Sequence, residues 1–170
     1  GRDPTLLLAG DDGKFEVART GGGVQIGQIG RGSIYTGTLD GPVTLVAQDN
    51  FARSIRLDES NRWQVLDQFN PAASGAKIVG AATLNLDGQP GNELVLVDAG
   101  LNTLRVLRKE GMQYQVWEQV ALGPFPYIAA RVVDLNGDQQ EDLLLFGASR
   151  FMVLYAGQRP PVLNMVATFE

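Results

Sequence analysis

The sequence predicts an all-β protein, because its apolar residues fall in short runs separated by turn residues and follow no helical pattern. The runs are rich in Val, Ile, Leu and aromatic residues, and Gly, Asn or Asp stands between them. Such runs are typical of β-strands. No stretch of eleven or more residues (about three helical turns) places its apolar side chains on one helical face. We therefore expect many strands joined by tight turns, and no long helix.

Individual strands are expected wherever such a run occurs, and some runs alternate as a half-buried strand does. In Tyr114–Val120, the apolar side chains of Tyr114, Val116 and Val120 share one parity. The expected strands are Thr5–Ala9, Phe15–Ala18, Val24–Ile29, Val43–Ala47, Ser54–Leu57, Trp63–Phe69, Lys77–Leu84, Glu93–Val97, Thr103–Leu107, Tyr114–Val120, Ile128–Leu135, Asp142–Phe146, Phe151–Tyr155 and Val162–Phe169.

Composition narrows the classes of function. The 170 residues suit one domain, and a net charge of −5 without a Lys or Arg cluster makes nucleic acid an unfavourable partner. The chain has no Cys and no His, so thiolate chemistry and a Ser-His-Asp triad are excluded. No apolar run approaches the ~20 residues that span a bilayer. The sequence begins at Gly1 without a signal peptide, which indicates a fragment or a processed chain.

An internal repeat organises the second half of the chain. The segment from Asn85 to Val97 aligns without a gap to the segment from Asp134 to Phe146, 49 residues later. Each begins with a short acidic or amide-rich stretch and ends in an apolar run. We name residues 85–93 the first acidic loop and residues 134–142 the second acidic loop. Each is expected to join two strands.

The repeat length predicts a β-propeller-like fold. Each period holds about four strands, and ~40–50 residues per four-stranded blade is typical of propellers. We expect about three and a half four-stranded antiparallel blades in a single segment, 1–170, with blades near 1–30 (partial), 31–74, 75–124 and 125–170. In the 31–74 blade, Gly37–Pro42 is expected in place of the acidic loop. Such a partial propeller would leave open edges, so we expect it either to self-associate or to belong to a larger propeller.

The second acidic loop is the clearest candidate site. Side-chain oxygens stand at positions one, three, five and nine, on Asp134, Asn136, Asp138 and Asp142. Calcium takes six to eight oxygen ligands, and the Gln140 backbone carbonyl and water could complete the shell. The loop lacks the Gly and Glu that an EF-hand carries at positions six and twelve. We expect a structural Ca²⁺ site here, against the simpler alternative of a turn held by its own amides.

The pattern Asp-x-Asn-Gly-Asp-x-x-x-Asp-Leu at 134–143 resembles the FG-GAP/VCBS family of repeats, and 85–94 resembles it less closely. The resemblance implies a calcium-containing β-propeller of the kind found in integrin α-subunit heads and bacterial exported proteins. It therefore implies an extracytoplasmic location, whether secreted, periplasmic or cell-surface. By matching position, it also makes Asp134, Asn136, Asp138 and Asp142 metal ligands.

The first acidic loop is a weaker candidate for metal. Its corresponding residues are Asn85, Asp87, Gln89 and Glu93, of which only Asp87 and Glu93 carry charge. Fewer carboxylates give weaker calcium affinity. We expect a plain turn here more than a metal site.

Aromatic residues give a second, less specific candidate. Phe125 and Tyr127 flank Pro126 in an expected connection between blades, where they could contact a ligand such as a sugar. Aromatic side chains at strand spacing more commonly belong to the core.

The predicted function is a non-catalytic binding or scaffold module that presents loops to a protein or glycan, with calcium stabilising one hairpin. The alternative is an accessory or partial domain of a carbohydrate-active or other propeller enzyme. Without His, catalysis would have to use residues such as Lys77, Arg131 or Tyr127. A third possibility is a purely architectural spacer.

Overall fold

The fold consists of β-strands and their connections. The computed structural model describes residues 6–9, 14–18, 24–28, 32–59 and 63–169. Within these ranges no helix is long and apolar enough to cross a membrane. The strands are β1 (Leu6–Ala9), β2 (Lys14–Ala18), β3 (Val24–Gln28), β4 (Gly32–Leu39), β5 (Gly41–Gln48), β6 (Phe51–Leu57), β7 (Trp63–Phe69), β8 (Ile78–Leu84), β9 (Glu93–Asp98), β10 (Thr103–Glu110), β11 (Gln113–Ala121), β12 (Tyr127–Val133), β13 (Asp142–Gly147), β14 (Arg150–Leu154) and β15 (Leu163–Thr168).

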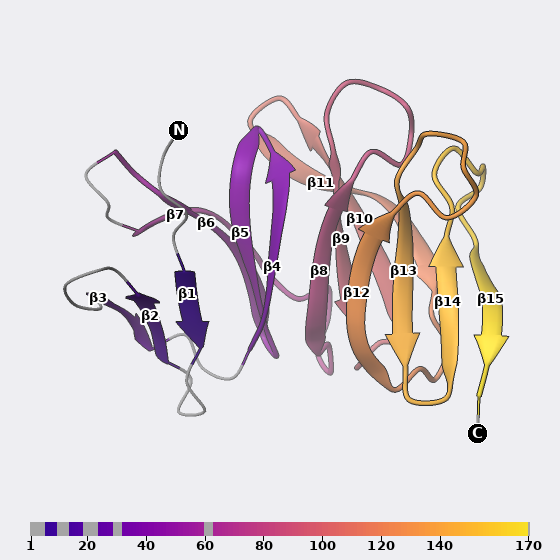
Figure 1. The fold of residues 1–170 in the computed structure, drawn as a ribbon, viewed down its shortest axis with the longest axis horizontal. Coiled ribbons are helices and arrows are strands. Elements are labelled where there is room, and N and C mark those ends of the chain that lie inside the picture. Colours follow the sequence, from indigo (N-terminus) through magenta and orange to yellow (C-terminus); the bar gives the residue numbers. More distant parts are fainter. Residues whose placement is uncertain (1–5, 10–13, 19–23, 29–31, 60–62, 170) are drawn as a thin grey trace.

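These strands form antiparallel sheets in which consecutive strands are neighbours. A three-stranded sheet has the order β1-β2-β3, and three four-stranded sheets contain β4–β7, β8–β11 and β12–β15. Strand β8 contacts β4 and β5 on one side and β12 on the other. Figure 1 shows β4, β8 and β12 side by side, nearest the viewer, with β10 and β11 behind them. The architecture is all-β and consistent with a partial propeller-like fold, as the sequence predicts.

Two hydrophobic clusters hold the three four-stranded sheets together. One lies between β4–β7 and β8–β11, with Leu45, Ile78 and Leu96 among its buried members. The other lies between β8–β11 and β12–β15 and includes Leu104 and Leu143. The sheet β8–β11 therefore has apolar neighbours on both faces. As a result, all six residues of β9 are buried.

The first strands of the three four-stranded sheets, β4, β8 and β12, are called the inner strands, and they approach one another closely at glycine positions. The hydroxyls of Tyr35 in β4 and Tyr127 in β12 share a hydrogen bond that reaches past β8. Gly80 of β8 makes this possible, because a Cβ at that position would collide with the Tyr127 ring. In the same way, a Cβ on Gly37 would collide with Thr83, whose Oγ1 accepts a hydrogen bond from the Thr38 amide at 3.0 Å. Close approach of the inner strands thus depends on glycine at two positions.

The connection expected in the 31–74 blade is a tight turn. The segment Gly37–Pro42, expected in place of an acidic loop, is mostly strand: β4 runs to Leu39, β5 begins at Gly41, and Leu39 pairs with Gly41 across a tight turn at Asp40. The Gly41 φ of 122° permits that turn. The sequence does not predict β4 at all, because 32–39 lacks an apolar run.

The two acidic loops lie where the sequence places them, between the first and second strands of adjacent sheets. The first acidic loop joins β8 to β9, and the second joins β12 to β13. Both are at the upper end of the molecule in Figure 1, together with the β14–β15 connection. The division of the whole chain into blades at 1–30, 31–74, 75–124 and 125–170 stays a prediction.

Candidate functional site: the two acidic loops

The second acidic loop is folded around its own side-chain oxygens, beginning with Asp134. Its Oδ1 accepts a hydrogen bond from the Gly137 amide at 2.7 Å, and its Oδ2 accepts one from the Gln139 amide at 3.0 Å. Gly137 and Gln139 have φ angles of 79° and 70°. The left-handed conformation is natural for glycine but unusual for glutamine, so the Asp134 carboxylate supports a backbone conformation that costs energy.

In the middle of the loop, side-chain oxygens also accept hydrogen bonds from backbone amides, here only two residues further along the chain. The Asp138 amide donates to Asn136 Oδ1 at 2.9 Å, and the Gln140 amide donates to Asp138 Oδ1 at 2.8 Å. The Asn136 side-chain amide also donates to Asp138 Oδ2 at 2.9 Å. Consecutive turns of this type bring the oxygens of Asn136 and Asp138 together, although both residues are exposed.

Asp142, at position nine of the loop, points into the protein and accepts hydrogen bonds from backbone amides. Its carboxylate is fully buried, and its Oδ2 accepts a hydrogen bond from the Leu135 amide at 3.1 Å. Its Oδ1 accepts one from the Ala156 amide at 3.0 Å. Ala156 belongs to the β14–β15 connection, so one side chain ties two connections of the same sheet together. Ala156 is buried, so its amide needs an acceptor within the protein, and Asp142 supplies it.

The first acidic loop has the same local bonds at the corresponding positions. Asn85 Oδ1 accepts from the Gly88 amide at 2.7 Å, as Asp134 does from the amide 49 residues later. Glu93 Oε2 accepts from the Leu86 amide at 2.7 Å, as Asp142 does from Leu135. Asp87 Oδ1 accepts from the Gln89 amide at 2.7 Å. The repeat that the sequence predicts is therefore also a repeat of side-chain to backbone contacts.

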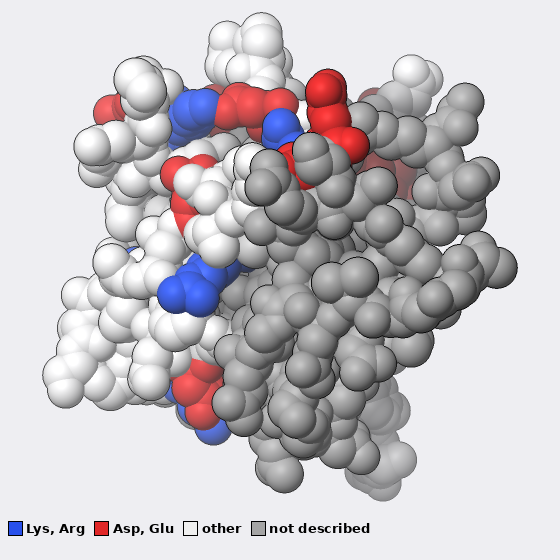
Figure 2. Space-filling view, turned by 90° about the vertical axis from the view of Figure 1, so that its left-hand side faces the viewer, with Lys and Arg blue, Asp and Glu red and all other residues white. Residues whose placement is uncertain are grey.

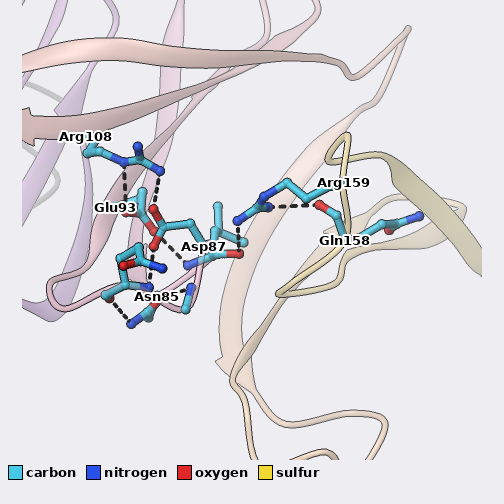
Figure 3. A network of polar contacts seen from close by, with 9 residues as sticks. Asn85, Asp87, Glu93, Arg108, Gln158 and Arg159 are labelled. Carbon is cyan, nitrogen blue, oxygen red and sulfur yellow. Dashed lines mark hydrogen bonds and ion pairs between the residues drawn. The ribbon is translucent and has the colours of Figure 1, made fainter.

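The two loops differ in what balances their negative charge. In the first acidic loop, the Arg108 guanidinium from β10 forms an ion pair with Asp87 and lies 3.7 Å, measured from its Nε, from Glu93 Oε1 (Figure 3). The Asp87 and Glu93 side chains are only 6% and 4% exposed. Burial raises the pKa of Glu93 and the nearby Asp87 adds to the rise, whereas Arg108 opposes it. An internal cation thus occupies the acidic centre of this loop.

Trp117 from the same sheet and Arg159 from the neighbouring sheet cover this ion pair. Arg108 lies over the Trp117 ring, with 4.2 Å from its guanidinium carbon to the ring centroid. Arg159, in the β14–β15 connection, lies over the same ring at 4.7 Å. Arg159 Nη2 donates to the Leu86 carbonyl at 3.0 Å (Figure 3). The Gly157 amide donates to the same carbonyl at 2.9 Å. The end loops of two adjacent sheets are therefore bonded into one surface.

The second acidic loop has no such cation among the residues that the structure describes. Leu107 pairs with Leu94 in one sheet and Leu154 pairs with Leu143 in the next, so the counterpart of Arg108 is the neutral Tyr155. Within the described ranges, no ion pair reaches Asp134, Asp138 or Asp142. These three carboxylates therefore lack, among the described residues, a counter-ion of the kind that Arg108 provides in the first acidic loop.

The donor atoms of the second acidic loop suit a hard cation such as Ca²⁺, because they are carboxylate and amide oxygens. Each carboxylate oxygen that accepts one amide proton keeps a further lone pair for a metal. Across residues 6–9, 14–18, 24–28, 32–59 and 63–169, no three His, Cys, Asp or Glu side chains already converge as metal ligands would. The loop therefore fits calcium in its chemistry, while its side chains bond to the loop's own amides.

The aromatic candidates, Phe125 and Tyr127, do not form an exposed platform. Phe125 is 5% exposed, and its ring packs against Gly147, where a Cβ would collide with it. Burial and the hydrogen bond to Tyr35 raise the pKa of Tyr127, whose ring is partly buried between inner strands. Stacking on a sugar requires an exposed ring face, so the expected ligand contact is not supported for Phe125, and the Tyr127 hydroxyl is already engaged.

Sequence reasoning does not find Arg108, Trp117 and Arg159 as members of this site. They stand 15 or more residues beyond the first acidic loop. Strand pairing brings Arg108 and Trp117 to it, and packing of the next sheet brings Arg159. A usable signal exists nevertheless: aligning the strands after each loop places Arg108 opposite Tyr155. The loop with fewer carboxylates is thus the one that has its own cation.

Figure 2 shows the side of the molecule that is at the left of Figure 1. Asp and Glu side chains gather mainly along its upper edge, next to Lys and Arg. The ion pair between Lys109 and Asp40 joins β10 to the β4–β5 turn. The end of the molecule that carries the acidic loops is therefore mixed in charge, with acidic groups prominent.

Comparison with known proteins shows the fold and leaves the family open. No family model matches the chain, and no curated protein matches it. A crystal structure of a protein from Lactobacillus plantarum, which has a propeller-like fold, matches 94% of this chain with a TM-score of 0.57 and 14% identity. The chain spans 52%, or about half, of that structure. Identity this low supports the fold alone, so the resemblance to FG-GAP/VCBS repeats rests on the loop residues themselves.

Asp142→Ala should destabilise the protein even without metal, because it leaves the amides of Leu135 and Ala156 unpaired. The cost comes mainly from the amide of Ala156, which is buried, because an unpaired buried donor costs about 1–3 kcal/mol. Asp142→Asn keeps one acceptor and should cost less. The matched control is Glu141→Ala, at an exposed position next in sequence, which should change the free energy of unfolding by less than about 0.5 kcal/mol. Urea denaturation in chelator measures all three, and equal effects of Asp142→Ala and Glu141→Ala would refute the structural role.

Arg108→Met should lower the free energy of unfolding by about 1–3 kcal/mol at neutral pH, since it leaves two buried carboxylates without a cation. Arg53→Met is the control, because Arg53 also lies over an aromatic ring but bonds to Gln68 rather than to a carboxylate.

The Arg108→Met loss should also depend on pH. Burial raises the pKa of Glu93 in the folded state, so its protonated form stabilises the fold at low pH and that gain disappears as the pH rises through this pKa. The difference between Arg108→Met and wild type should therefore shrink on acidification from pH ~7 to ~5. A difference that does not change with pH would contradict the role of Arg108 as a counter-ion.

Proposed function

We propose that this chain is a non-catalytic binding or scaffold module whose loop end contacts a protein or glycan, with Ca²⁺ held by the second acidic loop. The observation that carries the proposal is the joining of two adjacent sheets at that end. The Leu86 carbonyl accepts hydrogen bonds from both Gly157 and Arg159 of the next sheet. Loops held by a rigid scaffold are the usual carriers of binding.

The rigidity of this end favours binding. Its connections are held by buried acceptors, as Asp142 and Glu93 illustrate, and by the contacts of Arg108 and Arg159 with Trp117. A surface that is already ordered loses little conformational entropy when a partner docks. Its mixed charge and exposed amide groups suit a polar partner, such as a glycan or the hydrophilic surface of another protein.

Calcium is assigned to the second acidic loop alone. Asp134, Asn136, Asp138 and Asp142 would supply side-chain oxygens, and Gln140 a further oxygen. The bound ion would offset the repulsion that arises when the three aspartates converge on it, and it would fix the hairpin between β12 and β13. The Asp-x-Asn-Gly-Asp pattern that resembles FG-GAP/VCBS repeats supports this assignment. It also supports an extracytoplasmic location, where calcium is abundant enough to occupy a site of modest affinity.

The first acidic loop is proposed to need no metal. Asn85 and Gln89 are neutral, and Arg108 already balances Asp87 and Glu93. A divalent cation at this loop would have to displace Arg108 from its place against Trp117.

Thermal unfolding in calcium and in chelator tests the calcium assignment. Ca²⁺ at a hundredfold excess over its dissociation constant should raise the free energy of unfolding by about 2.7 kcal/mol. Asp134→Ala should abolish this gain. Asn85→Ala, the same position in the first acidic loop, should retain it. Failure of calcium to shift the unfolding of wild type would refute the metal site, as would an equal loss in the two variants.

Binding to immobilised glycans and candidate proteins, with calcium and then with chelator, tests the module itself. We expect at least one ligand class to bind through the loop end and to be weakened by Arg159→Ala, an exposed change at that end. A reproducible lyase or hydrolase activity of the purified chain, lost on changing a single carboxylate, would replace the binding role with the enzymatic alternative.

A further inference from the structure

The central residues of β13, Leu143–Phe146, are apolar on both faces of the strand, but the described residues of the chain cover only one of these faces. Leu143 and Leu145 are fully buried against β8–β11. The alternate residues, Leu144 and Phe146, are only partly buried. A strand apolar at every position is typical of a sheet packed on both faces. The sequence of β13 therefore indicates a second covering layer.

The equivalent strand one sheet earlier shows what full coverage looks like. In β9, Leu94, Val95, Leu96 and Val97 are all at most 1% exposed, because sheets lie on both sides of it. Strands β9 and β13 are aligned by the repeat and have nearly the same apolar content. They differ in burial because β12–β15 is the last sheet of the row (Figure 1).

The uncovered face of β12–β15 forms an apolar hollow of about 390 Å³. An aromatic cluster lines part of it: the ring centroids of Phe146 and Phe151 lie 5.0 Å apart, and those of Phe151 and Phe169 lie 4.9 Å apart. Ile128 on the same hollow is 64% exposed. Contiguous exposed apolar surface of this kind marks an interaction site.

The other end of the row supplies a matching partner. The sheet β1–β3 lies at the opposite end in Figure 1 and has three strands. Its first strand has the sequence Leu-Leu-Leu-Ala, which is apolar at all four positions, as are the central runs Leu94–Val97 of β9 and Leu143–Phe146 of β13. By pattern, β1 also suits a sheet that is packed on both faces. Each end of the row therefore has a strand whose sequence is suited to one more sheet.

We propose that the uncovered face of β12–β15 binds the β1–β3 end of a second copy of this chain, and that two copies close one propeller-like ring. A two-fold axis along the inner strands would make both junctions alike. The aligned crystal structure is about twice the length that this chain covers, so a closed array of this type needs about as much chain again. Two copies bring eight sheets, within the range of about 4–8 blades that propellers use.

Sedimentation equilibrium on the purified 170-residue chain tests the proposal. Wild type should have twice the chain mass of 18.3 kDa. Ile128→Glu places a charge on the hollow and should weaken the dimer at least about tenfold. The exposed position leaves the fold intact, which circular dichroism would verify. Val65→Glu is the control, because Val65 in β7 is similarly exposed, at 58%, and lies outside the hollow.

Phe169→Ser offers a second variant, at the last described residue, and should weaken the dimer in the same direction. A wild-type chain that stays monomeric at micromolar concentration would overturn the proposal. So would a series of masses above the dimer, because open head-to-tail growth is not ring closure. A dimer equally weakened by Val65→Glu and Ile128→Glu would place the interface elsewhere. None of these outcomes depends on calcium, so the measurement stands apart from the metal-site test.

Discussion

The structure depends on a simple constraint: a sheet in the middle of a row must bury both of its faces. This requires strands whose central residues are apolar on both faces, and β9 meets the requirement with Leu94, Val95, Leu96 and Val97. Each buried apolar side chain contributes about 1.5–3 kcal/mol relative to an exposed one. Stacking of sheets is therefore the main source of stability, and hydrogen bonds within each sheet set the register.

Stacking creates a second requirement at the connections. Strands packed on both faces bring buried amides to their ends, and those amides need acceptors. Acidic side chains at the ends of strands supply them. Asp142 accepts from two connections, and Asp98 accepts from the amides of Lys77, Gly100 and Leu101. These carboxylates are fully buried, so their primary role is to hold the backbone.

Much of the fold is local enough to be predicted from the sequence. The acidic loops fold through bonds between residues two to seven positions apart, such as Asn85 with Gly88, and for this reason their place between two strands is predictable. Strand β4 is missed because its place depends on distant contacts. The Thr38 amide bonds to Thr83, and Tyr35 bonds to Tyr127, 92 residues away. The turn at Asp40 replaces the loop that the repeat would suggest, because Leu39 pairs directly with Gly41.

The candidate site likewise contains local contacts that the sequence predicts and distant contacts that it does not. The sequence spacing alone identifies the side-chain oxygens of the second acidic loop, because these oxygens bond to amides only a few residues away. Arg108 is not evident, since its position relative to Asp87 is set by the pairing of β10 with β9. The Phe125 prediction fails for a related reason. A connection between sheets is exposed in general, yet this ring fills the space left by Gly147.

The contrast between the two loops has a physical consequence for how the protein responds to its surroundings. A guanidinium on the same chain is always present, so Arg108 balances Asp87 and Glu93 in any medium. A metal ion is present only where its concentration exceeds its dissociation constant. If both loops held calcium, the order of both sheets would vary with the medium. With an internal cation in the first loop, only the hairpin of the last sheet would vary if the second loop holds calcium as proposed, and that sheet also carries the uncovered apolar face.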